Sequence, residues 1–263
     1  MRENGLTPEE RWRIADLERR IEEDDDVDAM VEWAAFWAFN KREWPLSEDT
    51  KAKVLEYYEE GVRCGNQLAC LNLGAIYNEG VLVKRDYERS AELYRIASEI
   101  EDDNAIAAMA ITNLGYYYYY DFAGKQDYRK AFNCFLQGAL RYSNANAYYK
   151  LGDMYRYGHF VDQDDKMAFE LYMKAFNYED DGNFFKADVA YRLGDCFLNG
   201  IGCQKDLFAA LTVLEISERH FYEKIKRRDR EASEKFPKMM ALLDETKRQI
   251  AKELEIGNNT ENS

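Results

Sequence analysis

Apolar and small residues recur along most of the chain at spacings of three and four positions, the period that places side chains on one face of a helix. Four Leu-Gly pairs repeat within this pattern, and their glycines, Gly74, Gly115, Gly152 and Gly194, are separated by 41, 37 and 42 residues. Positions in each repeat are numbered from this glycine. Aromatic residues stand at +3, aspartates at +12, an aromatic residue or leucine at +20, and small residues at +16 and +23. The pattern predicts a helical repeat.

Each repeat is predicted to form two antiparallel helices. The glycine and the small positions let two helix axes approach closely, and the aromatic positions fill the space between neighbouring repeats. The aspartates at +12 are expected to cap the second helix by accepting its free backbone N–H groups. A shared metal site is the alternative, but successive repeats are offset by roughly 10 Å, too far for one coordination sphere. Capping is therefore the preferred interpretation for Asp86, Asp127, Asp164 and Asp206.

A fifth, less regular copy of the pattern precedes these four. The residues that match it are Ala29, Trp33, Ala34, Trp37, Val54, Tyr58 and Gly61. We predict an all-α fold of about five helical hairpins between two terminal helices. The predicted segments are a capping helix in residues 1–26, repeats in about residues 27–66, 67–104, 105–144, 145–183 and 184–222, a capping helix in residues 223–256 and a disordered tail in residues 257–263.

Both ends of the array need a capping helix, because a stack of helix pairs exposes an apolar face at each end. The N-terminal helix is predicted to begin after Thr7, with Pro8 in its first turn and Glu10 completing a capping box. The C-terminal helix is predicted to be capped by Ser233 and to end at Gly257.

The order Ala-x3-Leu-Gly-x2-Tyr-x2-Gly, followed by aspartate, alanine, an aromatic residue and alanine, resembles the Sel-one-like (Sel1-like) repeat, a relative of the tetratricopeptide repeat. A tetratricopeptide unit has about 34 residues, whereas these units run 37 to 42 and carry the second glycine of a longer loop. The resemblance covers roughly residues 27–222. It implies a right-handed α-solenoid that serves as an adaptor or scaffold for protein complexes, with no catalytic residues.

Composition narrows the expected partners and compartment. The formal charge of −14 repels phosphate groups, so nucleic acid is not an expected partner. The N-terminus lacks the apolar core of a signal peptide, no segment reaches the ~20 apolar residues of a membrane helix, and no two cysteines have CxxC spacing. We expect a cytoplasmic protein with reduced thiols, no membrane insertion, no metal and no cofactor. Acidic residues interleave with one basic cluster, which is interpreted as a solvated helix face: Lys224, Lys226, Arg227, Arg228 and Arg230.

The run Tyr116 to Tyr120 is the most informative feature for function. Five consecutive helical residues point all around the axis, so they cannot all be buried. The repeat places Tyr117 and Tyr118 in the core at +2 and +3. The variable positions −2, +1, +4 and +5 are expected to face outward, along the concave groove of tetratricopeptide-like arrays, and to bind a peptide or protein. The predicted binding residues are Asn72, Asn78, Glu79, Asn113, Tyr116, Tyr119, Tyr120, Lys150, Asp153, Arg156, Tyr157, Arg192, Asp195 and Asn199.

Other interpretations stay open. The tyrosines could instead pack against a neighbouring loop or a terminal helix. An alternative function is a dedicated inhibitor or immunity-type protein whose negative surface masks a basic target. A hydrolase that uses the acid pair Asp153 and Asp195 has only the surface position of these residues in its favour. We expect no enzyme, because the two histidines, His159 and His220, lie in different repeats and cannot act together.

Overall fold

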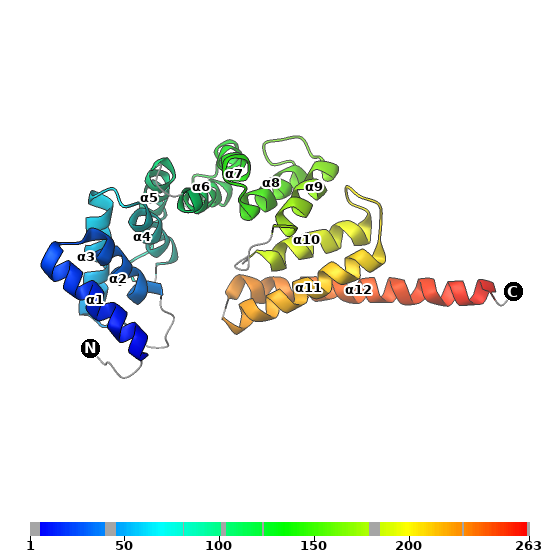
Figure 1. Ribbon diagram of the computed structural model, residues 1–263. Helices are drawn as coiled ribbons and strands as arrows, with labels where there is room; N and C mark the ends of the chain where they lie inside the picture. Colours follow the sequence, from blue (N-terminus) through cyan, green and yellow to red (C-terminus); the bar gives the residue numbers. More distant parts are fainter. Residues whose placement is uncertain are drawn as a thin grey trace. The chain divides into compact units, whose positions relative to one another are not determined.

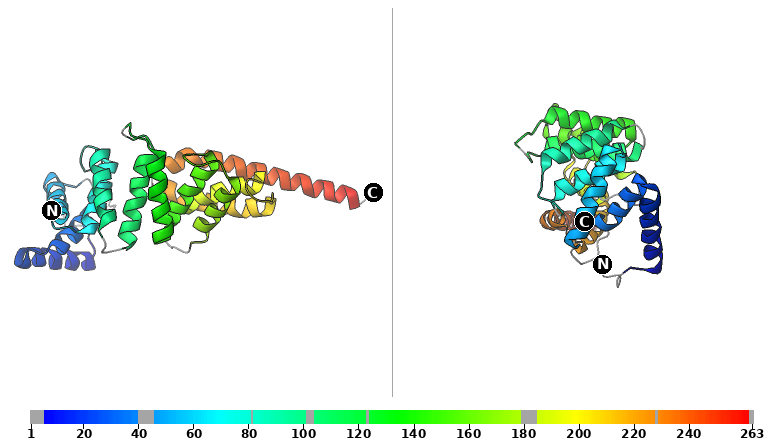
Figure 2. Two further views of the ribbon diagram at one scale, coloured as in Figure 1. Left: turned by 90° about the horizontal axis from the view of Figure 1, so that it is seen from above. Right: turned by 90° about the vertical axis from the view of Figure 1, so that its left-hand side faces the viewer.

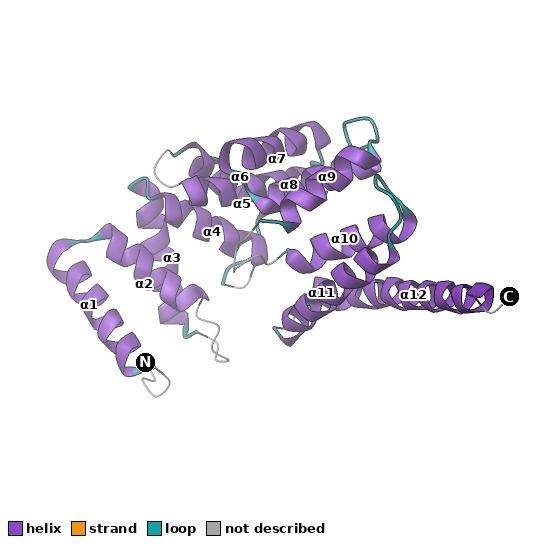
Figure 3. Cartoon of the chain, turned by 45° about the vertical axis from the view of Figure 1, so that its right-hand side comes forward, coloured by secondary structure: helices purple, strands orange, loops and turns teal. Residues whose placement is uncertain are grey.

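The computed structural model describes residues 6–39, 46–80, 82–100, 104–122, 124–178, 185–227 and 229–261. Within these ranges the regular elements are all α-helices, as the sequence pattern predicts, and no strand occurs (Figures 1 and 3). In chain order they are α1 (Pro8–Asp24), α2 (Val27–Phe39), α3 (Glu48–Arg63), α4 (Gln67–Glu79), α5 (Tyr87–Glu99), α6 (Asn104–Tyr119), α7 (Tyr128–Tyr142), α8 (Ala145–Tyr157), α9 (Asp165–Phe176), α10 (Lys186–Asn199), α11 (Leu207–Lys226) and α12 (Arg230–Glu261).

The chain divides into two compact units, residues 1–134 and residues 135–263, with the boundary inside α7. Within each unit, consecutive helices pack as pairs (Figure 2). In unit 1, α2 packs on α3 and α4 packs on α5; in unit 2, α8 packs on α9 and α10 packs on α11. These pairs are the helical hairpins that the repeat predicts.

The four aspartates at position +12 cap the second helices, as predicted. Each accepts a backbone N–H from the first turn of its helix at 2.9 to 3.0 Å, which satisfies a donor that has no partner within the helix. The glycines at position +6 end the first helices in the left-handed conformation, with φ of 68° to 69°, which glycine adopts without a steric cost. These glycines are Gly80, Gly158 and Gly200.

The glycine of each Leu-Gly pair lies where the two helices of a repeat touch. A methyl group on Gly152 would come within 2.6 Å of the Tyr172 ring, and one on Gly74 within 2.8 Å of the Tyr94 ring. The glycine of the fourth repeat faces Leu214 in the same way. All three contacts join the origin of a repeat to its position +20, so the predicted register is confirmed for these repeats.

The core of unit 1 includes the irregular first hairpin. Trp33 of α2 and Tyr58 of α3 are fully buried in it, and Trp33 Nε1 donates to a Glu18 carboxylate oxygen of α1 at 3.2 Å. Helix α1 begins as predicted: the Thr7 hydroxyl accepts the Glu10 N–H, and the Glu10 carboxylate accepts the Thr7 N–H. The N-terminal helix is therefore packed on the first hairpin.

In unit 2, α12 covers α11, and its start differs from the prediction. Met239 and Leu243 of α12 are completely buried together with Phe221 of α11. The helix begins at Arg230, because the Asp229 carboxylate accepts the Ala232 N–H at 2.9 Å. The predicted cap at Ser233 is wrong, since this residue lies inside the first turn and donates its hydroxyl to the Asp229 carbonyl.

The end of α12 also differs from the prediction. The helix continues through Gly257 to Glu261, and its last turns extend past α11 (Figure 1). One glycine in a helix interior costs about 1 kcal/mol relative to alanine, which weakens a helix without ending it. The predicted end at Gly257 is therefore wrong.

Candidate functional site

A group of stacked aromatic rings surrounds the end of α6 in unit 1. The rings of Tyr116 and Tyr120 are parallel within 3° with centroids 5.9 Å apart, and those of Tyr87 and Phe122 stack at 4.8 Å. Tyr120 and Phe122 lie 5.5 Å apart and connect the two stacks. Tyr120 keeps 36% of its surface exposed and Phe122 keeps 40%. We call Tyr87, Tyr116, Tyr120 and Phe122 the aromatic cluster.

The turn after α6 holds the aromatic cluster through polar contacts. Position +6 is Asp121 in this repeat, and its carboxylate accepts the Gln126 N–H at 3.3 Å. The Gln126 side chain donates to the Tyr119 carbonyl at 3.0 Å. Lys125 forms an ion pair with Glu88 of α5 beside the cluster. These contacts connect the turn, which carries Tyr120 and Phe122, to α5 and α6, which carry Tyr87 and Tyr116.

The tyrosine run is arranged differently from the prediction. Tyr120 is exposed as expected, but Tyr119 is only 8% exposed, so its predicted outward position is wrong. Its ring lies 5.5 Å from the Tyr128 ring of α7, which covers this side of the helix end. Tyr117 and Tyr118, predicted to be core residues, are half-buried. Position +4 is also buried in the fourth repeat, so it was incorrectly assigned to the outward face.

Position +5 is exposed in all four repeats, as predicted. The residues there are Glu79, Tyr120, Tyr157 and Asn199. Position +4 is less uniform, since Asn78 and Arg156 are only partly exposed. Fewer positions of each first helix therefore face outward than the four that the sequence predicts, −2, +1, +4 and +5.

Position −2 makes contacts within the protein. The Asn72 side chain donates to the Tyr58 hydroxyl at 3.3 Å, and Asn113 hydrogen-bonds to the Tyr94 hydroxyl. In both contacts the tyrosine belongs to the second helix of the preceding repeat. Burial raises the pKa of Tyr94 to about 12, a rise that hydrogen bonds from Ser90 and Asn113 limit. The two asparagines therefore satisfy buried hydroxyls, a role that sequence reasoning missed.

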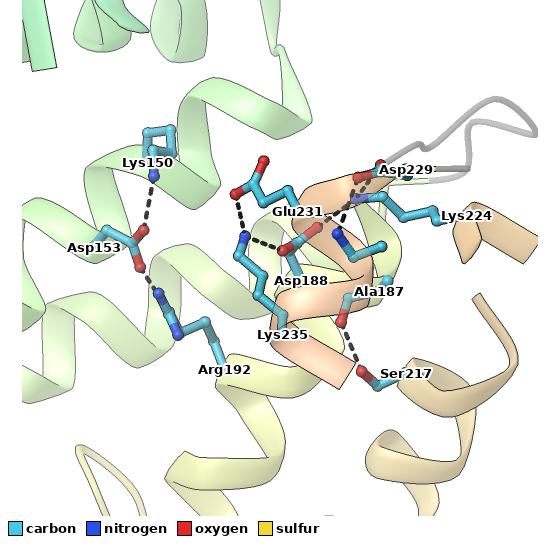
Figure 4. Close-up of polar contacts among 11 residues, drawn as sticks. Lys150, Asp153, Ala187, Asp188, Arg192, Ser217, Lys224, Asp229, Glu231 and Lys235 are labelled. Carbon is cyan, nitrogen blue, oxygen red and sulfur yellow. Dashed lines mark hydrogen bonds and ion pairs between the residues drawn. The ribbon is translucent and has the colours of Figure 1, made fainter. Parts of the chain in front are cut away.

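In unit 2 the same face carries a buried ion-pair group (Figure 4). Asp153 at position +1 of α8 accepts three bonds of 2.9 Å, from Lys150 Nζ, from Arg192 Nε of α10 and from the Tyr172 hydroxyl of α9. Lys150 and Asp153 are each 2% exposed. Their predicted outward positions are wrong, because opposite charges at −2 and +1 pair with each other and can be buried together.

The charges in this group set the ionisation of Asp153. Burial alone raises the pKa of a carboxyl, but Lys150 and Arg192 outweigh that effect and hold the pKa of Asp153 well below its usual range. Both carboxylate oxygens are occupied by the bonds described above. The prediction that Asp153 is a solvated acid is therefore wrong, and no neutral carboxyl is present there to act as a general acid near pH 7.

Tyr157 lies at the exposed edge of this group. Its side chain is 49% exposed, and the guanidinium groups of Arg156 and Arg192 lie 6.0 and 5.7 Å from its ring centroid. Arg156 also bonds to Asp165 of α9 at 2.9 Å. On α10, Asp195 accepts the Asn199 side-chain amide at 2.8 Å and is partly exposed. Tyr157 and Asn199 are thus the exposed members of the predicted set in unit 2.

A second buried carboxylate fastens α12 to α10 (Figure 4). Asp188 binds Lys224 of α11 at 2.9 Å and Lys235 of α12 at 2.5 Å, and it is 3% exposed. Burial tends to raise the pKa of Asp188, but the two lysines lower it overall. Lys224 was predicted to be on a solvated face, which is wrong. The contacts cross 36 and 47 residues of sequence, so no local pattern indicates them.

In the described part of the chain, no three histidine, cysteine, aspartate or glutamate side chains lie close enough together to hold a metal ion. None of the described helices has the length and apolarity needed to cross a bilayer. The five cysteines are free thiols, and burial raises the pKa of Cys134 and of Cys196 to about 12.

Comparison with protein families gives four matches to the Sel1 repeat, at residues 67–102, 108–142, 145–177 and 187–212. These segments coincide with the four regular repeats found from the glycine register. The irregular first hairpin lies outside them. No curated protein matches the chain.

Solved structures with a similar fold are Sel1 repeat proteins. One from Oxalobacter formigenes is 19% identical with a TM-score of 0.61, covering 77% of this chain and 78% of that one. A protective antigen of uropathogenic Escherichia coli with an SLR fold is 20% identical with a TM-score of 0.54, covering 88% of this chain and 56% of its own. A Klebsiella pneumoniae protein is 18% identical with a TM-score of 0.50, covering 86% and 99%. At these identities the likeness concerns the fold.

Proposed function

This chain belongs to the Sel1 repeat family, and we propose that it is a scaffold that binds a segment of a partner protein at its aromatic cluster. Sel1 repeat proteins generally mediate protein–protein interactions and are typically not catalytic. The outward face of α4 and α6 in unit 1 is the proposed binding surface. Its exposed residues at position +5, Glu79 and Tyr120, would contact the partner.

The observation that carries this proposal is the exposure of ordered rings in the aromatic cluster. Tyr120 and Phe122 are more than a third exposed while their rings stay stacked on Tyr116 and Tyr87. Large rings held in place bury much apolar area on binding and lose little conformational entropy, which is why aromatic residues dominate binding hot spots. The cluster therefore supports recognition of a protein surface or peptide.

The polar surroundings of the cluster suit an interface rim. Lys125 and Glu88 pair at its edge, and the Arg85 guanidinium lies 5.5 Å from the Tyr87 ring centroid. Protein interfaces commonly combine an aromatic centre with such a charged rim. Arg85 holds this rim in place, because its Nη atoms donate to the Tyr87 hydroxyl at 3.2 Å and to the Glu79 carbonyl at 2.9 Å.

The buried members of the predicted set have a different proposed role. Asn72, Asn113, Asp153 and Tyr119 contact neighbouring helices of their own unit, and Lys150 pairs with Asp153. We propose that they keep the first helices in position and do not meet the partner. The five free thiols support a reducing compartment, and the cytoplasm is the proposed one.

The proposal is tested by removing the two exposed rings. The double variant Tyr120→Ser, Phe122→Ser should keep its fold, because the rings are partly exposed, and should lose at least about tenfold in partner capture. The measurement is affinity capture by the tagged full chain with mass spectrometry, followed by direct binding of the identified protein. Melting temperature is recorded for every variant.

A matched control comes from unit 2. Phe208→Ser with Tyr222→Ser removes one phenylalanine and one tyrosine that are 62% and 47% exposed there. This control should capture the same proteins as the unchanged chain. Undiminished capture by a folded Tyr120→Ser, Phe122→Ser variant would rule out the aromatic cluster as the binding surface.

A further inference from the structure

Phe160, in the loop after α8, has a backbone conformation that disfavours its side chain. Its φ is 72°, in the left-handed region that bulky L-residues rarely adopt. Phe160 stands at position +8 of its repeat, and the residue at +8 of the fourth repeat is Gly202, with φ of 69°. The third and fourth repeats therefore share the left-handed conformation at +8, which glycine adopts without a steric cost. A phenylalanine there is costly to the fold.

The strained phenylalanine also leaves apolar surface in contact with solvent. Phe160 is 52% exposed, so its ring contributes less to the core than a buried ring would. The loop begins directly after Tyr157, which is 49% exposed and whose ring lies 5.8 Å from that of His159. Residues held in a strained backbone conformation cluster at functional sites. The end of α8 and the loop after it thus carry two partly exposed aromatic side chains, Tyr157 and Phe160.

Arg192 supplies a polar group beside this aromatic surface. Its guanidinium lies 5.7 Å from the Tyr157 ring and 5.6 Å from the Tyr191 ring. Within the described residues it makes one hydrogen bond, from Nε to Asp153, and its side chain is 23% exposed. No described residue accepts a hydrogen bond from the terminal Nη1 and Nη2 atoms. Two such coplanar donors match the two oxygens of a carboxylate.

The nearby acidic side chains do not occupy these donors. Asp165 pairs with Arg156, and Asp195 accepts the amide of Asn199. Asp153 lies between Lys150 and Arg192 and keeps the Arg192 side chain in one orientation. A carboxylate from a partner would thus meet a guanidinium that is already held in position. The acidic side chains around it already have partners of their own.

We propose that Tyr157, Phe160 and Arg192 form a docking site for a protein segment that presents an aspartate or glutamate side chain beside an apolar side chain. The carboxylate binds the Nη atoms of Arg192, and the apolar side chain packs on the rings of Tyr157 and Phe160. The inference rests on the proposed scaffold function, because it assumes a protein partner. It concerns unit 2 and does not depend on the aromatic cluster.

The probe is a random peptide library displayed on phage and selected on the full chain. The enriched sequences are expected to pair an acidic residue with an apolar neighbour. Selected peptides are then synthesised with amidated C-termini, and their dissociation constants are measured by fluorescence polarisation. Replacing the acidic residue of a peptide by its amide should weaken binding about tenfold, the effect of losing one charged hydrogen-bond pair.

Two variants separate recognition from folding. Phe160→Gly should raise the melting temperature, since glycine relieves the left-handed strain, and should weaken peptide binding about tenfold. Arg192→Lys keeps a positive charge for Asp153 but removes the coplanar donors, so it should weaken the acidic peptide about tenfold and its amide counterpart hardly at all. Arg219→Lys, which changes an exposed arginine of α11, is the matched control and should leave the affinity unchanged.

Several results would overturn this inference. The first is a selection that yields no peptide, or only peptides without acidic residues. The second is an unchanged affinity in Phe160→Gly or Arg192→Lys. The third is peptide binding that requires a free C-terminal carboxylate or a phosphate. Failure here is distinguishable from failure of the scaffold function, because that function is tested by partner capture through Tyr120 and Phe122. If the unchanged chain binds no acidic peptide but still captures its partner through Tyr120 and Phe122, only the docking site is rejected.

Discussion

The two units place opposite chemistry at the same position of their first helices. Position +1 is Tyr116 in unit 1, a half-buried ring stacked on Tyr120. In unit 2 it is Asp153, a buried carboxylate bonded to Lys150, Arg192 and Tyr172. Each of these residues directly follows the glycine of its Leu-Gly pair, so the two positions are equivalent in the repeat. The repeat thus determines where a side chain points, while the residue chosen determines whether the face exposes rings or buries charges.

This difference has consequences for stability and for binding. Stacked rings that are partly exposed can be lost at modest cost, so the aromatic cluster is free to serve a partner. A buried ion pair is costly to break, because the remaining charge is left without a counter-ion in a dry environment. We therefore expect unit 2 to depend on its charges for folding and unit 1 to depend far less on its exposed rings.

The largest effect is expected from breaking the buried ion pair. Asp153→Ala should destabilise unit 2 by about 3–5 kcal/mol, because Lys150 and Arg192 lose their shared counter-ion. Tyr116→Ala should cost unit 1 about 0.5–1.5 kcal/mol from the lost ring stacking. Urea unfolding followed by segment-resolved hydrogen exchange measures both losses. Equal losses in the two units would remove the contrast between them.

The glycine register should give similar effects in the two units. Gly152→Leu and Gly74→Leu each place a side chain against a tyrosine ring of the paired helix, and each should cost about 1–3 kcal/mol or more. Melting curves of the two variants provide the measurement. A variant that keeps the original melting temperature would show that the register assigned to its repeat is wrong.

Acid should destabilise unit 2 before unit 1. The folded pKa values of Asp153 and Asp188 are lower than those of an unfolded aspartate, about 3.9. Their stabilising contribution is therefore complete above about pH 4 and is lost as the pH falls through the lowered pKa values. Unit 1 also holds an aspartate with a lowered pKa, Asp26, but that side chain is partly exposed and its ion pair contributes less.

The tryptophans make this third prediction measurable. All four lie in unit 1, at positions 12, 33, 37 and 44, so their fluorescence reports on that unit. Circular dichroism reports on the helices of both units. On lowering the pH, the dichroism signal should begin to fall before the fluorescence changes. Transitions that coincide, or fluorescence that changes first, would contradict the prediction.

The helix pairs and their register could be predicted from the sequence because each fixed position has a strict steric or hydrogen-bonding requirement. Gly152 has no room for a side chain against Tyr172, and Asp164 caps the helix that follows it. Few residue types satisfy such requirements, so the same types recur in every repeat. The exposed tyrosine at the end of the run, Tyr120, follows from the same register.

The burial of the variable positions could not be predicted in the same way. Lys150 and Asp153 look like surface residues one at a time, and they are buried because they pair with each other and with Arg192. Tyr119 is buried by Tyr128, which lies across a turn whose path the repeat does not specify. The strain at Phe160 could not be predicted either, because position +8 holds glycine only in the fourth repeat, at Gly202.

The central claim is that the aromatic cluster is the partner-binding surface, and hydrogen exchange of the full chain with and without its captured partner tests it most directly. Peptides spanning residues 116–122 and the start of α5 should exchange more slowly when the partner is bound, because their backbone becomes shielded. Protection confined to other helices, with the segment 116–122 unchanged, would contradict the claim.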